Sequence, residues 1–222
     1  MVNRAPFAPE EWYHCYSRGV DKRIVFEDSK DYERFLQLLY LLNNKDTIHR
    51  SDFKRPSTPE VLLIPRGKPI VAIGAYCLMP NHFHLLLKEN TSSGISQFMR
   101  KLGIAYAMYF NIKNERVGNL FVKPFRSRHI PDDRYFKRVV QYIHLNAAEL
   151  FEPAWKQGKV YNVKLLEKKL YQYRYSSMSD YYGVKRPEQV ILSQEVRDLF
   201  EDLPPINQLI FESVEYYQGM SR

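Results

Sequence analysis

Two hydrophobic periods alternate along this chain, and together they predict a mixture of helices and strands. Three segments carry apolar residues at the three-and-four spacing of an amphipathic helix, namely residues 29–44, 93–114 and 131–150. Before the first of these segments and between them lie short apolar or aromatic runs of the kind that form strands. These runs are residues 12–18, 70–79, 82–88, 120–122 and 126–130.

Polar residues indicate where two of the helices begin. Ser29 is predicted to cap the first helix, because Asp31 and Glu33 then fall in its first turn. Pro131-Asp132-Asp133 predicts the start of the third helix, which is expected to continue to about Leu150.

The order of these elements predicts an α+β sandwich, with an antiparallel sheet and helices on one face. Residues 70–79 and 82–88 are separated only by Pro80-Asn81, so we expect them to pair as a hairpin. The chain from about residue 171 onward is expected to add helices at the C-terminal end. A main domain over residues 1–183 and a helical extension over 184–222 are the predicted divisions.

Composition favours an anionic partner. The net charge is +8, and 17 tyrosines and 13 phenylalanines supply rings that could stack on unpaired bases. No apolar run reaches the roughly 18 residues of a membrane span, and the N-terminal residues lack an apolar signal core. We therefore expect a cytoplasmic protein. Its two cysteines, Cys15 and Cys77, are expected to be buried free thiols.

The triplet His82-Phe83-His84 is a candidate metal site. On a strand, residues two apart point to the same face, so the two imidazoles lie side by side and Phe83 points into the core. Apolar residues precede and follow the triplet, which places it in a packed sheet and gives it a rigid setting. The alternative is a strand edge that carries two histidines without a ligand.

Tyr142 and Asn146 form a polar pair on the third predicted helix. Residues four apart are neighbours on a helix, and both lie at the flank of its apolar stripe. Taken alone, the pair is also compatible with a boundary tyrosine whose ring is packed and whose hydroxyl meets water.

These segments together resemble the single-tyrosine (HUH-type) transposases, and in particular the REP-associated tyrosine transposases. Residues 76–86, Tyr-Cys-Leu-Met-Pro-Asn-His-Phe-His-Leu-Leu, are similar to the family's histidine segment, and residues 142–146, Tyr-Ile-His-Leu-Asn, to its tyrosine helix. Residues 13–19 resemble its opening strand, and residues 173–181 its closing motif. The family has proline after the asparagine where this chain has Ala147, so a longer helix is expected here.

The resemblance implies a ferredoxin-like core and a DNA-cutting and DNA-joining enzyme. Tyr142 would be the nucleophile and form a covalent phosphotyrosine link. His82, His84 and Asn146 would hold a divalent metal, Mg²⁺ or Mn²⁺, at the scissile phosphate. By ligand type alone, two imidazoles also suit zinc or nickel. The implied substrate is single-stranded DNA beside a hairpin, and both a monomer and a homodimer remain open.

Basic residues are expected to line the path of the DNA through phosphate contacts. The alternative for each is an ordinary solvated surface charge. The candidates follow the first strand or surround the strand before the tyrosine helix, and they are Arg18, Lys22, Arg23, Lys123, Arg126 and Arg128.

Two other functions are compatible with the same residues. One is a metal-dependent hydrolase that uses water as nucleophile, in which Tyr142 is structural. The other is a non-catalytic module that binds single-stranded nucleic acid on a ferredoxin-like sheet. Only the transposase hypothesis predicts a covalent adduct between protein and DNA.

Overall fold

The computed structural model describes residues 6–45, 56–197 and 204–220, with side chains described as far as residue 214. Its centre is an antiparallel four-stranded sheet with the strand order β2-β3-β1-β4. The strands are β1 (Trp12–Arg18), β2 (Val71–Met79), β3 (His82–Glu89) and β4 (Arg126–Ile130). Helix α1 (Ser29–Leu41) follows β1, and α3 (Gly94–Lys113) follows β3. This succession and strand order are those of a ferredoxin-like sandwich, so the predicted α+β class is confirmed.

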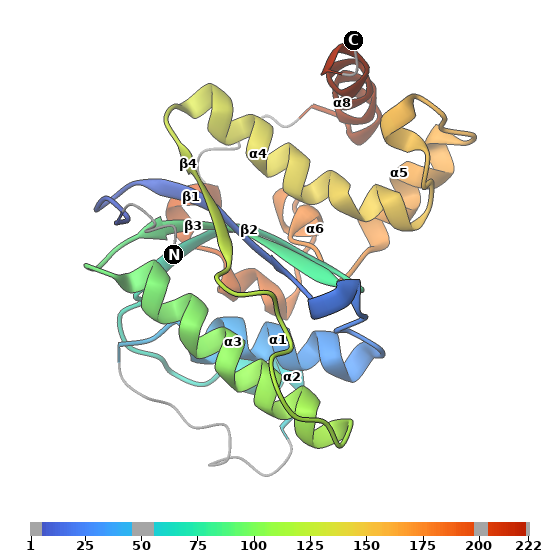
Figure 1. Ribbon diagram of the computed structural model, residues 1–222. Coiled ribbons are helices and arrows are strands. Elements are labelled where there is room, and N and C mark those ends of the chain that lie inside the picture. The colour runs from blue at the N-terminus through green and yellow to red at the C-terminus, as the bar shows by residue number, and fades with distance from the viewer. Residues whose placement is uncertain (1–5, 46–55, 198–203, 221–222) are drawn as a thin grey trace.

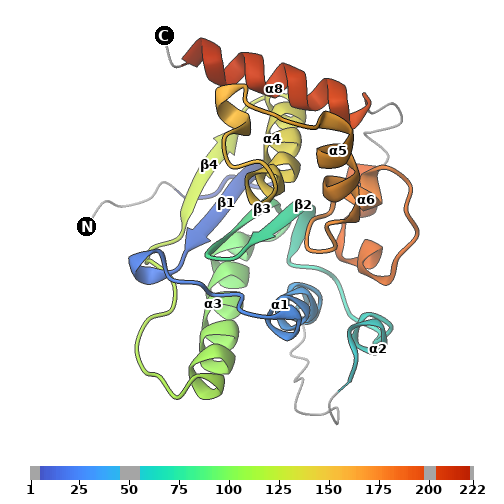
Figure 2. The same cartoon turned by 90° about the vertical axis from the view of Figure 1, so that its right-hand side faces the viewer.

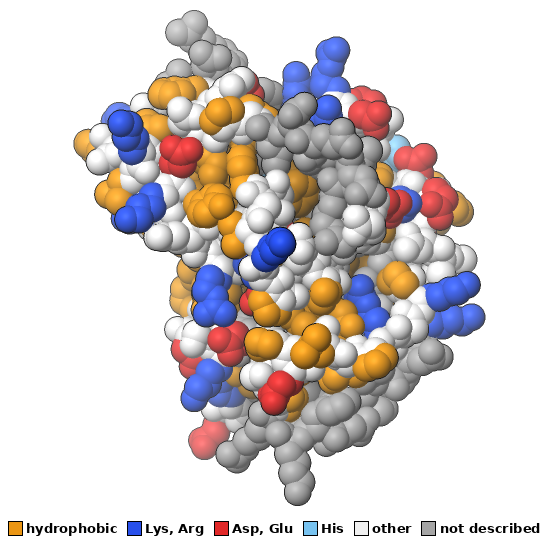
Figure 3. Space-filling model, turned by 180° about the vertical axis from the view of Figure 1, so that it is seen from behind, with side chains coloured by type: hydrophobic (Ala, Val, Ile, Leu, Met, Phe, Trp, Pro, Cys, Tyr) orange, Lys and Arg blue, Asp and Glu red, His pale blue; other side chains and the backbone are white. Residues whose placement is uncertain are grey.

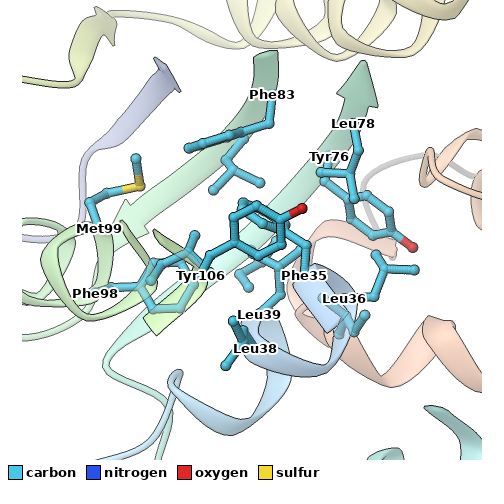
Figure 4. Packing of buried hydrophobic residues seen from close by; sticks show 14 of the residues in the cluster. Phe35, Leu36, Leu38, Leu39, Tyr76, Leu78, Phe83, Phe98, Met99 and Tyr106 are labelled. Atoms are coloured by element: carbon cyan, nitrogen blue, oxygen red, sulfur yellow. The ribbon is translucent and has the colours of Figure 1, made fainter. Parts of the chain in front are cut away.

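Helices α1 and α3 cover one face of the sheet (Figure 1). Phe35 of α1 and Tyr106 of α3 meet Phe83 of β3 in an apolar core, with 4.9 Å between the ring centroids of Phe35 and Phe83. Figure 4 shows these rings packed between the two helices and the strands above them. Phe83 therefore points into the core, as the strand alternation predicted.

The opposite face of the sheet is covered by α4 (Asp133–Leu145), which Figure 1 shows above the strands. The buried residues of α4 pack against β2 and β3 in a second apolar cluster that includes Val140, Ile143 and Leu86. The expectation that helices lie on one face was therefore incomplete. It holds for α1 and α3, but every residue of β2 is buried because a layer covers each side of the sheet.

The C-terminal part of the chain wraps around this centre (Figure 2). Ile191 and Leu192 join the first cluster, while Val196 and Leu209 join the second. The remaining elements are η1 (Val20–Lys22), α2 (Thr58–Leu62), η3 (Asn146–Leu150), η4 (Trp155–Gln157), α5 (Val163–Gln172), α6 (Met178–Tyr181), η5 (Pro187–Ile191), α7 (Gln194–Arg197) and α8 (Ile206–Met220). No helix in the described part of the chain combines the length and apolar character needed to span a bilayer.

Three predicted boundaries require correction. Asp28, not Ser29, caps α1, because its extended backbone lets the carboxylate accept the Asp31 N–H at 3.1 Å. The expected strand 120–122 is a single bridge between Gly19 and Phe121. The tyrosine helix leaves the α conformation after Leu145 and continues to Leu150 as the 3₁₀ turn η3. The predicted hairpin of β2 and β3 is confirmed.

Both cysteines are free and buried, as predicted. Cys77 lies opposite His84 in the pairing of β2 with β3. Burial raises the pKa of the Cys77 thiol to about 12, so it stays protonated at neutral pH. This thiol therefore contributes packing next to the histidine strand and no charge.

Candidate active site

The register of the sheet places polar side chains of β1 and β3 beside one another on the face that α4 covers. Tyr16 pairs with His84, and Arg18 pairs with His82. Opposed residues in an antiparallel pair point to the same face, so these four side chains form one polar group. The rings of His82 and His84 lie 5.0 Å apart, centroid to centroid, as expected for neighbours on one side of a strand.

A third imidazole, His14 of β1, lies against this pair. Its Nε2 is 2.8 Å from Nδ1 of His84, and the two rings meet edge to edge, with 5.0 Å between centroids and 23° between their planes. Both residues are buried. His14 was not among the candidates selected from the sequence, although strand alternation from Tyr16 places it on the same face.

Helix α4 carries Tyr142 to these imidazoles. Asp132 caps the helix by accepting the Tyr135 N–H at 2.8 Å, and the buried stripe through Val139 and Ile143 packs against the sheet. Tyr142 lies at the edge of that stripe, half-buried. Its ring is roughly perpendicular to those of His14 and His84, with 5.6 Å between centroids in each case.

Asn146 lies where α4 gives way to η3. It is buried, and its Nδ2 donates to the backbone oxygen of Tyr142 at 2.7 Å. The next residue, Ala147, packs in the same apolar cluster as Cys77, and Cys77 is the cross-strand neighbour of His84. The start of η3 is thus held beside the histidine strand, and the amide nitrogen of Asn146 is engaged on its own helix.

The three imidazoles are neutral at pH 7. Burial, reinforced by the Arg128 guanidinium, lowers the pKa of His14 to about 4. Burial together with Arg18 lowers the pKa of His82 to about 4. Burial and the neighbouring His14 lower the pKa of His84 well below its ordinary value. Neutral imidazole is the form that binds a metal.

The donor set suits a divalent cation by its chemistry. His82 and His84 offer imidazole nitrogens, and Asn146 offers an amide oxygen. Within the described residues, no group of three His, Cys, Asp or Glu side chains is placed to hold a metal ion. A metal at this position therefore depends on the Asn146 amide, the substrate or water as a further ligand.

Burial raises the pKa of Tyr142, and the Asn146 side chain acts in the opposite direction. The hydroxyl is consequently protonated at neutral pH. A tyrosine in this setting becomes a nucleophile only when positive charge stabilises the phenolate.

A pocket of about 550 Å³ opens between α4, the sheet and α8. Arg128 and Arg138 provide positive charge, while Tyr16, Tyr135 and Tyr142 provide rings. The complete lining is His14, Tyr16, His84, Arg128, Tyr135, Arg138, Val139, Gln141, Tyr142, Trp155, Glu212 and Ser213. Arg138 and Tyr135 were not selected as binding residues from the sequence, because the position of α4 over the sheet was not known.

The six basic candidates separate into two groups. Arg18, Arg126 and Arg128 lie on the sheet face that carries the histidines, since they pair with His82, Tyr16 and His14. The Arg128 guanidinium also lies 5.1 Å above the ring centroid of Tyr135. The other three, Lys22, Arg23 and Lys123, lie in connecting segments beyond the strand ends.

Lys22 and Lys123 are exposed, whereas the Arg23 side chain donates to the backbone oxygen of Val20 at 3.1 Å.

The charged side chains on the back of the molecule are arranged differently from those around the pocket. Figure 3 shows lysine and arginine side chains there interspersed with acidic and apolar ones. Among the described residues of that face, charges of both signs are therefore mixed.

Comparison with known proteins gives a family match over part of the chain and a similar fold. Residues 67–146, which contain His82, His84, Tyr142 and Asn146, match the family described as "Transposase IS200 like". The structure is similar to that of a REP-associated tyrosine transposase bound to a REP hairpin, with a TM-score of 0.51 and 12% sequence identity. The match covers 92% of this chain and 96% of that one. No curated protein matches the chain. The resemblance inferred from the sequence is confirmed at the level of the family segment and the fold.

Proposed function

We propose that this chain, whose residues 67–146 match the IS200-like transposase family, cuts and rejoins single-stranded DNA through a covalent bond to Tyr142. The observation that carries the proposal is the meeting of Tyr142 with His14 and His84 at 5.6 Å between ring centroids. They share a pocket with Arg128 and Arg138. The proposed nucleophile, the proposed metal ligand His84 and two guanidinium groups thus line one cavity.

In the proposed reaction, the Tyr142 oxygen attacks the phosphorus of a DNA phosphodiester. The hydroxyl releases its proton to water, and a bond forms between the Tyr142 oxygen and phosphorus. One sugar oxygen leaves and takes up a proton from water, and the strand end stays attached as a phosphotyrosine. The free strand end, or another one, can then attack the phosphotyrosine and restore a phosphodiester. Because the link conserves the bond energy, rejoining requires no external energy source.

His82, His84 and the Oδ1 atom of Asn146 are the proposed ligands of Mg²⁺ or Mn²⁺. When bound, such an ion would polarise the scissile phosphate and favour the phenolate form of Tyr142. Tyr142 and His84 meet within one copy of the chain, with 5.6 Å between their ring centroids, which supports a reaction that uses no residue from a second copy.

Single-stranded DNA beside a hairpin is the proposed substrate. The pocket combines guanidinium groups with tyrosine rings, and the stacking of Arg128 over Tyr135 is the kind of surface on which an unpaired base can lie. A structural relative of this chain is bound to a REP hairpin, which supports a substrate of the same kind.

A denaturing gel tests the proposal against its two alternatives. The full chain is incubated with end-labelled hairpin DNA carrying a single-stranded flank, in Mn²⁺ and separately in EDTA. We expect a labelled species that migrates with the protein, forms only with the metal and disappears after protease treatment. Cleavage without such a species would favour a hydrolase that uses water, and retention of intact DNA would favour a binding module.

A further inference from the structure

A neutral imidazole can bind a metal only through the nitrogen that carries no proton. Which nitrogen that is depends on the hydrogen bond made by the other one. The surroundings of His82 and His84 therefore decide whether the two rings are ready to act as ligands before a metal arrives. In both rings it is Nδ1 that meets a neighbouring side chain, and the two neighbours are Asn81 and His14.

The Asn81 amide fixes the proton of His82. Its Oδ1 is 2.6 Å from Nδ1 of His82, while its Nδ2 donates to the backbone oxygen of Lys22 at 3.3 Å. Since the amide nitrogen faces a carbonyl oxygen, the oxygen is the atom that faces the imidazole. An amide oxygen can only accept, so Nδ1 of His82 must carry the proton and Nε2 keeps its lone pair.

The turn that holds Asn81 is itself fixed. Asn81 follows Pro80 between β2 and β3, and its backbone oxygen accepts the Gly19 N–H at 2.8 Å. The backbone oxygen of Pro80 accepts the N–H groups of Val25 and Phe26. The amide is therefore presented to His82 from a backbone segment tied to the chain that follows β1.

His14 contacts Nδ1 of His84, as Asn81 contacts Nδ1 of His82. The 2.8 Å separation between His14 Nε2 and His84 Nδ1 requires one proton between the two nitrogens. If His14 donates, the proton of His84 lies on Nε2 and that ring cannot bind a metal. If His84 donates, its Nε2 is available. Ring contacts hold His14 in place, with 5.1 Å between its centroid and that of Tyr16 and 5.0 Å between its centroid and that of His84.

We infer that Asn81 and His14 are positioning residues, each accepting a hydrogen bond from Nδ1 of one histidine so that Nε2 of both His82 and His84 is free to bind a divalent cation. The inference rests on the proposed function, because it takes His82 and His84 as ligands. It adds a requirement for two residues that do not touch the metal.

The metal-free protein gives the first test. In the full chain labelled with ¹⁵N-histidine, long-range ¹H–¹⁵N spectra report which ring nitrogen carries the proton. We expect both His82 and His84 to carry it on Nδ1. Asn81→Ala should abolish that preference at His82 alone, and His14→Leu should abolish it at His84 alone. A proton on Nε2 of either ring in the wild-type protein would overturn the inference.

Metal affinity gives the second test, with Mn²⁺ titrated and the free ion measured by electron paramagnetic resonance. We expect Asn81→Ala and His14→Leu to weaken binding by about 10-fold or more. His14→Gln should restore most of it, because its amide oxygen can accept the His84 proton where the imidazole nitrogen did. A His14→Leu protein that binds Mn²⁺ as tightly as wild type, or a glutamine variant no better than leucine, would contradict the assignment.

The two readouts separate this inference from the proposed function. If both rings carry the proton on Nδ1 but Mn²⁺ binding does not depend on His82 and His84, the metal-dependent reaction is wrong while Asn81 and His14 still set the tautomers. If Mn²⁺ binds through His82 and His84 and the rings carry their protons elsewhere, the proposed function stands and this inference fails. Circular dichroism of each variant checks that the fold is retained.

Discussion

The phenol ring of Tyr142 is perpendicular to the imidazole ring of His84, with 5.6 Å between their centroids. Tyr142 lies on α4 and His84 on β3, so the contact exists only because α4 packs across the sheet. The apolar stripe of the helix thereby determines where the hydroxyl is presented. Packing and the candidate chemistry are thus set by the same interface.

Removal of either imidazole should abolish metal-dependent cleavage. We expect His82→Ala and His84→Ala to weaken Mn²⁺ binding more than about 100-fold, beyond the loss typical of an outer-shell change. Asn146→Ala removes one neutral ligand and should cost less, about 10-fold. Isothermal titration calorimetry measures all three. Full metal-dependent activity in either histidine variant would rule out the ligand assignment, and unchanged affinity in Asn146→Ala would place the third ligand elsewhere.

Binding of hairpin DNA with a single-stranded flank should weaken as salt rises, because phosphate contacts release counterions. Arg128 lines the pocket, so Arg128→Ala should reduce the slope of log affinity against log salt by about 0.7. Fluorescence anisotropy over a series of salt concentrations measures the slope.

Arg100→Ala is the matched control for this experiment. Arg100 is exposed on α3, on the opposite side of the sheet from the pocket, and its loss should leave the slope unchanged. A flat salt response in the wild-type protein, or equal effects of the two substitutions, would remove Arg128 from the DNA path. A preference for plain duplex would argue against the proposed substrate.

The stability of the protein should fall in mild acid because of His144. This residue is buried on α4 beside Ser177, with 2.8 Å between its Nε2 and the serine Oγ. Burial lowers the pKa of His144 from 6.5 to about 3, so between these values the unfolded chain binds a proton that the folded chain does not. The free energy of unfolding therefore decreases as pH falls through that window.

A glutamine at this position isolates the contribution of His144. The glutamine of His144→Gln can still donate to Ser177 but does not titrate. Near pH 4.5, the free energy of unfolding of this variant should therefore change with pH less steeply than that of the wild-type protein, by about 1.4 kcal/mol per pH unit. Urea unfolding at pH 4 to 7 measures the difference. Parallel profiles for the two proteins would show that His144 is protonated in the folded state.

Much of the central sheet was predictable from local pattern. β1 was predicted with its observed bounds, and β2 and β3 to within one residue, because their apolar runs end at turn residues such as Pro80-Asn81. The side-by-side placement of His82 and His84 followed from strand alternation alone. Local rules sufficed wherever the relevant neighbours lie close in sequence.

The second layer of the sheet was not predicted, although β2 carries a signal for it. An unbroken apolar run, in contrast to an alternating one, is typical of a strand covered on both faces. His14 was missed for a different reason. Strand alternation places His14 beside Tyr16, but only the register of β1 with β3 brings His14 to His84. The register of a strand depends on contacts that are distant in sequence, so a local pattern does not predict it.

The measurement that tests the central claim most directly is the identification of the residue joined to DNA. Full-length protein is incubated with hairpin DNA and Mn²⁺, digested with protease and analysed by mass spectrometry. Tyr135 is the natural rival, since it lines the same pocket beneath Arg128. We predict that the wild-type protein carries a nucleotide on Tyr142. Tyr142→Phe should bind DNA and metal normally but form no adduct and cleave nothing. Tyr135→Phe should still cleave the DNA. A nucleotide attached at Tyr135, or undiminished cleavage by Tyr142→Phe, would contradict the account.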